Sequence, residues 1–124
     1  MATVTLTNDN HDMTVKDGIV FIDFWAAWCG PCRMFAPIFE RAAEKHTDIT
    51  FAKVDTDDQV ELAARYGVQS IPTLVIYRDG IPLFAQPGAL PEPVLEDLIA
   101  QTRGLDMDDV RAKYAEQLAA AEKS

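Results

Sequence analysis

Residues that commonly bind metal ions are scarce in this sequence of 124 residues, which has only two cysteines and two histidines. A structural zinc site usually needs four such ligands, and no second Cys-x-x-Cys pair is present to complete one. His11 and His46 stand in polar surroundings, without ligand spacing to the cysteines. We therefore expect no metal site, and we expect both histidines to be solvated surface residues.

Basic residues are also few, since 11 lysines and arginines stand against 20 acidic residues and the net charge is −9. This negative charge opposes unaided binding to nucleic acid or to an anionic membrane. Partners should therefore be proteins or small molecules.

Long apolar segments are missing as well. No run approaches the roughly 18 apolar residues of a membrane span, and the N-terminal stretch MATVTLTNDNHDMTV lacks the basic and apolar regions of a signal peptide. We expect a soluble, cytoplasmic protein that does not contact a membrane. Because cytoplasmic thiols are kept reduced, a Cys-x-x-Cys pair there is more often catalytic than structural.

The apolar residues, 48% of the chain, suffice for the core of one globular domain. Residues 19–25 are consecutively apolar except for Asp23, which is typical of a central strand covered on both faces. Apolar residues at helical spacing predict a helix over residues 31–46. Further strands are predicted at 4–6, 49–54, 73–77 and 81–86, and helices at 8–15, 57–67 and 92–102.

Turn residues refine this pattern. Asp57 is predicted to begin a helix that ends at Gly67, and Asp79-Gly80 predicts a tight hairpin. Pro82 has no N–H to donate and therefore marks its strand as an edge strand. Beyond Gly104, Asp106 resembles a helix cap, followed by an apolar stripe of Met107, Val110, Tyr114 and Leu118.

Both cysteines lie in the stretch WCGPC, which is residues 28–32. Cys29 precedes the helix that Pro31 opens, so free backbone N–H groups and the positive end of the helix dipole should stabilise its thiolate. This predicts Cys29 as a nucleophile. Cys32 lies one turn further on the same face, within reach of a mixed disulfide formed by Cys29. A purely structural disulfide is the other interpretation, but so short a loop would stabilise the fold little.

Several further motifs occur with WCGPC in a consistent order: residues 23–26 (DFWA), Pro37, residues 53–55 (KVD), residues 70–73 (SIPT) and residues 88–89 (GA). Together they resemble the bacterial-type thioredoxin family over roughly residues 3–103. The resemblance implies an α/β thioredoxin fold, a central mixed sheet of four to five strands flanked by helices. It implies a thioredoxin domain at 1–103, followed by a C-terminal amphipathic helical extension at 104–124.

The resemblance also implies roles for individual residues. Cys29 resembles the attacking cysteine, Cys32 the resolving cysteine, and the two form the redox disulfide. Asp23 resembles a buried aspartate that takes a proton from Cys32, and Lys53 resembles the amine close to it. From the residues alone, Asp23 could equally be an exposed carboxylate at a strand end, and Lys53 a plain surface cation.

A docking surface for client proteins is implied around the disulfide. Pro72 resembles the cis-proline of the family, which leaves the backbone of Ile71 free to pair with an extended substrate. The full set of implied substrate-binding residues is Trp28, Gly30, Pro31, Ile71, Pro72, Gly88 and Ala89.

The function implied is a protein-disulfide reductase, an electron carrier, because Gly30-Pro31 is the reductant's version of the motif. Electrons would come from NADPH through a separate flavoprotein, thioredoxin reductase, so no cofactor is expected on this chain, which we expect to be a monomer. The alternative is a binding protein or holdase on the same scaffold that uses the C-terminal extension. That extension either packs on its own domain, frays into solvent, or docks a partner.

Overall fold

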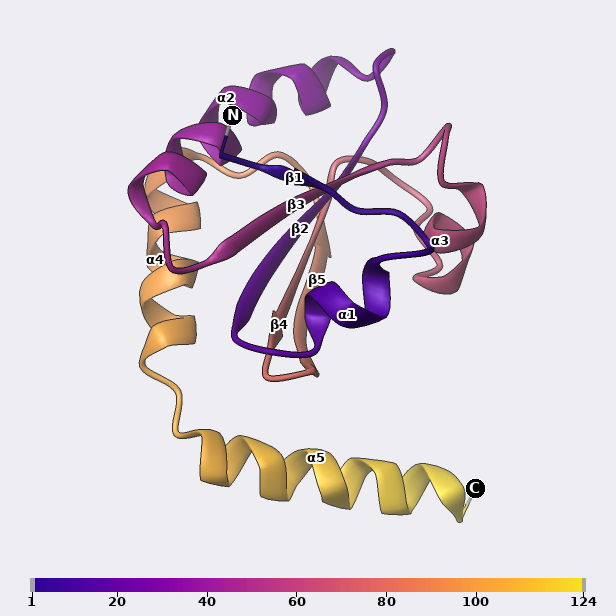
Figure 1. Ribbon diagram of the computed structural model, residues 1–124, viewed down its shortest axis with the longest axis vertical. Coiled ribbons are helices and arrows are strands. Elements are labelled where there is room, and N and C mark those ends of the chain that lie inside the picture. Colours follow the sequence, from indigo (N-terminus) through magenta and orange to yellow (C-terminus); the bar gives the residue numbers. More distant parts are fainter. Residues whose placement is uncertain (1, 124) are drawn as a thin grey trace.

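The computed structural model describes residues 2–123 and has a sheet of five strands at its centre (Figure 1). The strands are β1 (Val4–Thr5), β2 (Ile19–Trp25), β3 (Thr50–Asp55), β4 (Thr73–Arg78) and β5 (Ile81–Pro87). They lie in the order β1-β3-β2-β4-β5. The first three in that order are parallel, whereas β4 pairs antiparallel with β2 and with β5. The predicted mixed sheet is thus confirmed.

Helices cover both faces of the sheet (Figure 1). They are α1 (His11–Val15), α2 (Gly30–Lys45), α3 (Val60–Arg65), α4 (Glu92–Arg103) and α5 (Met107–Glu122). Helices α2 and α4 pack on one face, where Phe39 and Leu95 are fully buried. Helices α1 and α3 pack on the other, where Val15 and Leu62 are buried. Coverage of both faces explains why β2 is apolar at almost every position.

The core on the α2 side is rich in aromatic rings. The ring of Phe39 lies 5.2 Å from that of Phe51 and 5.7 Å from that of Phe35, centroid to centroid. All three side chains are at most 1% exposed. Each buried phenylalanine contributes about 2 kcal/mol through the apolar area it removes from water, so this cluster holds α2, and with it the WCGPC segment, against the sheet.

Short-range signals predicted the turns correctly. Asp79 and Gly80 have φ values of 53° and 81°, the left-handed pair of a tight hairpin. Pro82 lies in β5, which is an edge strand of the sheet. Gly67 follows α3 with φ 62°, as expected for a left-handed residue at a helix end.

Two predicted helix starts are wrong. Helix α3 begins at Val60 after Gln59, not at Asp57, because the Asp57 carboxylate accepts a hydrogen bond from the Trp28 indole instead of capping a helix. Helix α1 begins at His11 rather than at residue 8, because Thr7 and Asn10 exchange side-chain hydrogen bonds that form a turn.

Neither histidine is a solvated surface residue. His11 is 3% exposed and contacts Asp12 and the hydroxyl of Tyr66. The ring of His46 is mostly buried between Glu96 and Arg103, with its Nε2 2.8 Å from a Glu96 oxygen. Each ring has a partner distant in sequence, Tyr66 for His11 and Glu96 for His46, which a pattern of local polar neighbours does not reveal.

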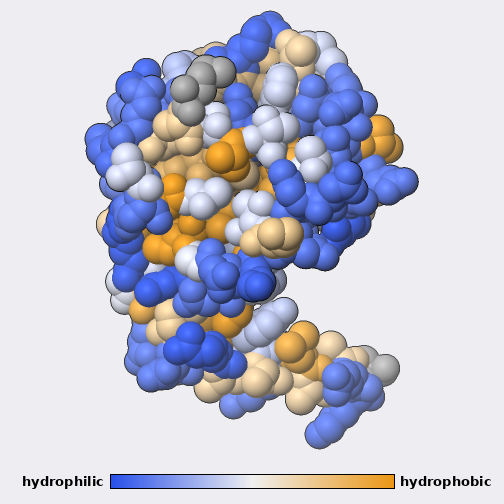
Figure 2. Space-filling view, in the orientation of Figure 1, coloured by the Kyte–Doolittle hydropathy of each residue, from blue (hydrophilic) through white to orange (hydrophobic). Residues whose placement is uncertain are grey.

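Helix α5 extends away from the rest of the molecule (Figure 1). Asp106 caps it by accepting hydrogen bonds from the N–H groups of Asp108 and Asp109. The predicted apolar stripe packs only at its start: Met107 is 8% exposed, Val110 and Tyr114 are half-buried, and Leu118 is 49% exposed. Figure 2 shows hydrophobic residues at the surface of this projecting helix.

Candidate active site

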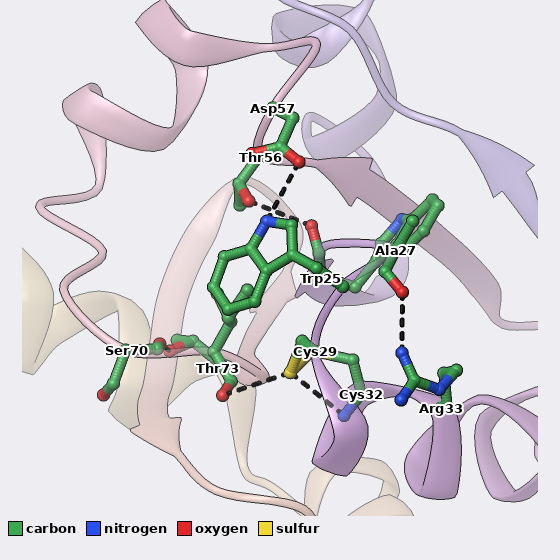
Figure 3. The surroundings of a disulfide bond; sticks show 11 residues. Trp25, Ala27, Cys29, Cys32, Arg33, Thr56, Asp57, Ser70 and Thr73 are labelled. Atoms are coloured by element: carbon green, nitrogen blue, oxygen red, sulfur yellow. Dashed lines mark hydrogen bonds between the residues drawn. A yellow bond between two sulfur atoms is a disulfide. The ribbon is translucent and has the colours of Figure 1, made fainter.

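The cysteine pair lies where β2 leads into α2 (Figure 3). Cys29 and Cys32 form a disulfide with their Cα atoms 5.2 Å apart. Cys29 is the N-cap of α2, and its Sγ accepts a hydrogen bond of 3.2 Å from the backbone N–H of Cys32. Both residues are nearly buried, at 5% and 3% exposure. The sulfur of Cys29 therefore occupies the position that a capping oxygen takes in other helices.

This placement favours negative charge on the Cys29 sulfur. The first N–H groups of a helix have no partner within the helix, and their dipoles point at the cap. Pro31 stands at the start of α2, where a proline costs no hydrogen bond. Backbone N–H donors at the start of a helix stabilise a thiolate relative to a thiol, and the Cys32 N–H holds that position beside the Cys29 sulfur.

Arg33 contributes to this site and was not predicted from the sequence. Its Nη1 donates a hydrogen bond of 2.8 Å to the carbonyl oxygen of Ala27 (Figure 3). This bond ties the first turn of α2 to the loop that precedes Cys29. Its position directly after Cys32, a cation next to a Cys-x-x-Cys pair, was the sequence feature that could have indicated it.

Asp23 is fully buried, as the resemblance implies, at 0% exposure. Neither carboxylate oxygen has a hydrogen-bond partner among the described residues. Burial raises the pKa of Asp23 to about 7, and the positive charge of Lys53 opposes that rise. Asp23 and Lys53 are register partners on β2 and β3, and the Lys53 Nζ lies 4.9 Å from the centre of the Trp25 ring.

A cavity of about 100 Å³ lies behind the disulfide. Cys32 and Lys53 both line it, together with Trp25, Ala26, Ala27, Arg33 and Ala36. A space of this size is large enough for a water molecule between these two residues.

Ile71, one of the predicted docking residues, lies beside the Cys29 sulfur. The Ile71 carbonyl oxygen lies 3.7 Å from the Cys29 Sγ, and the Ile71–Pro72 peptide bond is cis. The Gly88 N–H donates a bond of 2.8 Å to the Pro72 carbonyl oxygen, which places the 88–89 loop beside this edge. Gly88 has φ 115°, and a Cβ there would meet nothing within 4 Å, so its surface is open to an approaching backbone.

Trp28 completes the rim of the site. Its side chain is 68% exposed, and its indole N–H donates a hydrogen bond of 3.0 Å to Asp57. Pro31 and Ala89 are exposed, whereas Gly30, the first residue of α2, is half-buried. Trp28, Gly30 and Pro31 adjoin the cysteines in the chain. Ile71 contacts the Cys29 sulfur, Pro72 is hydrogen-bonded to Gly88, and Ala89 comes next in the chain.

Comparison with known proteins agrees with this geometry. The family model described as Thioredoxin matches residues 2–101. The chain belongs to the thioredoxin family. The Streptomyces coelicolor protein named "Putative thioredoxin 2" is 57% identical over 121 residues, covering 97% of this chain and 90% of that protein. A thioredoxin of Alicyclobacillus acidocaldarius is 45% identical over 101 residues, covering 80% of this chain and 96% of its own.

Solved structures give the same result. A mutant thioredoxin from Halobacterium salinarum superposes with a TM-score of 0.77 at 37% identity, covering 83% of this chain and 92% of that one. The fold is therefore the thioredoxin fold with an added C-terminal helix. With its CGPC pair at disulfide distance, the protein is a thiol-disulfide oxidoreductase that reduces protein disulfides. The binding-protein alternative is not favoured by these findings.

Thioredoxins act without a bound cofactor. Among residues 2–123, no group of three or more His, Cys, Asp or Glu side chains is arranged to hold a metal ion. No helix in this described part of the chain is long and apolar enough to cross a membrane.

Proposed function

We propose that Cys29 attacks the client disulfide and Cys32 resolves the intermediate. The Cys29 thiolate bonds to one client sulfur, and the other client sulfur leaves as a thiolate. The Cys32 thiolate then attacks the Cys29 Sγ, which restores the Cys29–Cys32 disulfide and releases the second client thiolate. Two electrons pass from the protein to the client. The observation that carries this assignment is the Cys32 N–H donating to the Cys29 sulfur at the start of α2.

Asp23 is proposed to accept the Cys32 proton when Cys32 must become a nucleophile. A buried carboxylate with a pKa of about 7 is suited to exchange a proton near neutral pH. Water in the cavity behind Cys32 would carry the proton, since that cavity also reaches Lys53. Lys53 would tune Asp23, because its positive charge favours the ionised carboxylate.

Clients are proposed to dock as an extended segment along the rim of the disulfide. The backbone of Ile71 lies beside the Cys29 sulfur and would pair with the client backbone, with Pro72 and Gly88 bordering the groove. Trp28 would cover the client on one side and Ala89 on the other. Gly30 and Pro31, which carry little bulk next to Cys29, would leave room for the client sulfur.

The electrons are proposed to come from NADPH through a thioredoxin reductase, with the protein acting as a monomer in the cytoplasm. The absence of bound cofactors in thioredoxins and the reductant's Gly30-Pro31 pair support this route. Disulfide-bearing proteins are the clients that follow from the family.

We further propose that residues 1–103 form the catalytic domain and residues 104–124 an accessory helix. Residues 1 and 124, the outer ends of these two segments, lie outside the described residues. Two observations support this division. Only the first turns of α5 pack against the rest of the molecule, and within residues 2–123 this helix contributes no residue to the rim of the disulfide.

A trapping experiment tests the order of attack. The reduced Cys32→Ser variant should form a covalent complex with insulin that is visible on a non-reducing gel and is released by dithiothreitol. The matched Cys29→Ser variant, which keeps the inner thiol, should form none. Equal capture by both variants, or capture by Cys29→Ser alone, would reverse or remove the assignment.

A further inference from the structure

A chain of polar side chains lies apart from the disulfide and has no part in the exchange chemistry. His11 contacts an Asp12 oxygen through Nδ1 at 2.7 Å and the Tyr66 hydroxyl through Nε2. The Tyr66 hydroxyl in turn lies 2.8 Å from the Tyr77 hydroxyl. Arg65 binds the same Asp12 oxygen at 3.2 Å. The members come from α1, the end of α3, and β4.

The direction of these hydrogen bonds follows from their chemistry. A carboxylate only accepts, so the His11 Nδ1 carries the proton that faces Asp12. The Tyr66 hydroxyl lies within hydrogen-bond reach of the His11 Nε2 and donates to the Tyr77 hydroxyl. Burial and the Tyr77 hydroxyl raise the pKa of Tyr66 above its ordinary value, so this hydroxyl stays protonated and able to donate.

Tyr66 lies next to two elements that lead to the docking rim, the segment 67–72 and strand β2. It is the C-cap residue directly after α3, and the segment 67–72 that follows carries Ile71 and Pro72 to the disulfide. Its ring lies 5.0 Å from that of Phe24 on β2, the strand that leads to Cys29. Tyr66 therefore contacts the strand that leads to Cys29 and directly precedes the segment that borders the Cys29 sulfur.

A hollow of about 270 Å³ adjoins the segment 67–72. It is lined by Tyr66 and by residues of the segment, of β4 and of β5, among them Ser70, Thr73 and Gln86. Two local bonds hold the ends of the segment: the Thr73 Oγ1 donates to the Ser70 carbonyl, and the Val68 N–H donates to the Ala63 carbonyl. The hydroxyl of Tyr66 adds contacts with His11 on α1 and Tyr77 on β4, which these local bonds do not supply.

We infer that Tyr66, held by His11 and Tyr77, is a positioning residue that sets where Ile71 and Pro72 meet the client. This inference rests on the proposed docking of clients at that edge. It places the effect in client binding, whereas the reactivity of the Cys29 thiolate, which depends on the start of α2, stays as it is. Loss of one hydrogen bond of this kind should raise the KM for a protein client about 3- to 10-fold.

The test compares two substrates of the full-length protein. Tyr66→Phe keeps the ring against Phe24 and removes the hydroxyl, and Tyr77→Phe removes the next link of the chain. Tyr114→Phe, a tyrosine on α5 far from the rim, is the matched control. Each variant is assayed with insulin, which needs the docking edge, and with dithiobis-nitrobenzoate, a small disulfide that reports thiol reactivity alone. Circular dichroism verifies folding.

The expected result is a raised KM for insulin in Tyr66→Phe and a smaller rise in Tyr77→Phe. The rate with the small disulfide and the kcat for insulin should stay near wild type, and Tyr114→Phe should change nothing. An unchanged KM in Tyr66→Phe, or an equal loss with both substrates, would overturn the inference. Failure of the wild-type protein itself to reduce insulin would instead remove the proposed function on which the inference rests.

Discussion

Replacement of Asp23 by asparagine should make the oxidised protein more stable at neutral and alkaline pH. The Asp23 side chain is 0% exposed, and its two oxygens have no partner within residues 2–123. Ionising such a group costs free energy, because a charge is held in a medium that solvates it poorly. Asparagine has nearly the same shape and no charge, so the variant removes that cost without leaving a cavity.

The magnitude follows from the pKa of Asp23, which is about 7 in the folded protein against 3.8 for an ordinary aspartate. Between these two values the unfolded chain has released the proton while the folded chain still holds it. The stability of the wild type therefore falls as pH rises from 3.8 and levels off above about 7. A difference of about three pKa units corresponds to roughly 4 kcal/mol lost in total.

Guanidinium unfolding of both oxidised proteins at pH 3.5 and pH 8 measures this difference. At pH 8 the Asp23→Asn variant should be more stable by up to about 4 kcal/mol, and at pH 3.5 the two should be nearly equal. Asp17→Asn, at an exposed turn position, serves as the control and should show no such gain. Equal stabilities at pH 8, or a gain that grows toward low pH, would refute the reasoning.

Three further predictions concern the surroundings of the site. In Lys53→Met the pKa of Asp23 should rise above about 7, since the Lys53 cation lowers it in the wild-type protein. NMR titration of the Asp23 carboxyl group measures this pKa, and an unchanged or lower value would contradict the prediction. Phe39→Ala should lower the free energy of unfolding by about 3 to 5 kcal/mol in urea titration, because the ring is 0% exposed; a loss below about 1 kcal/mol would show that the core refills. Deletion of residues 104–124 should leave reductase turnover within twofold of wild type. It should lower the free energy of unfolding by about 1 to 2 kcal/mol, because the burial of Met107 is lost. A larger fall in turnover would give the extension a catalytic role.

Features that depend on neighbouring residues could be predicted from the sequence. The Asp79-Gly80 turn, the left-handed Gly67 and the position of Cys29 before a proline-opened helix all follow from backbone chemistry within a few residues. The resemblance to thioredoxins added the burial of Asp23, which the apolar strand alone left open.

Features that depend on distant partners could not be predicted in this way. Asp57 has a side chain suited to cap a helix, but its carboxylate accepts a hydrogen bond from the Trp28 indole, 29 residues away in sequence. His11 has polar neighbours in sequence and is buried nevertheless, because Tyr66 and Tyr77 supply its surroundings. In both cases the choice between two local structures is made by tertiary contacts.

The central claim, reduction of client disulfides through Cys29 and Cys32, is tested most directly by NADPH consumption. Purified protein is added to a thioredoxin reductase and insulin, with Cys29→Ser measured in parallel. The account predicts steady NADPH oxidation that depends on the wild-type protein and is abolished in the variant. No NADPH oxidation by wild-type protein whose disulfide cycles with dithiothreitol would contradict the proposed electron route, and turnover that persists in Cys29→Ser would contradict Cys29 as the attacking thiol.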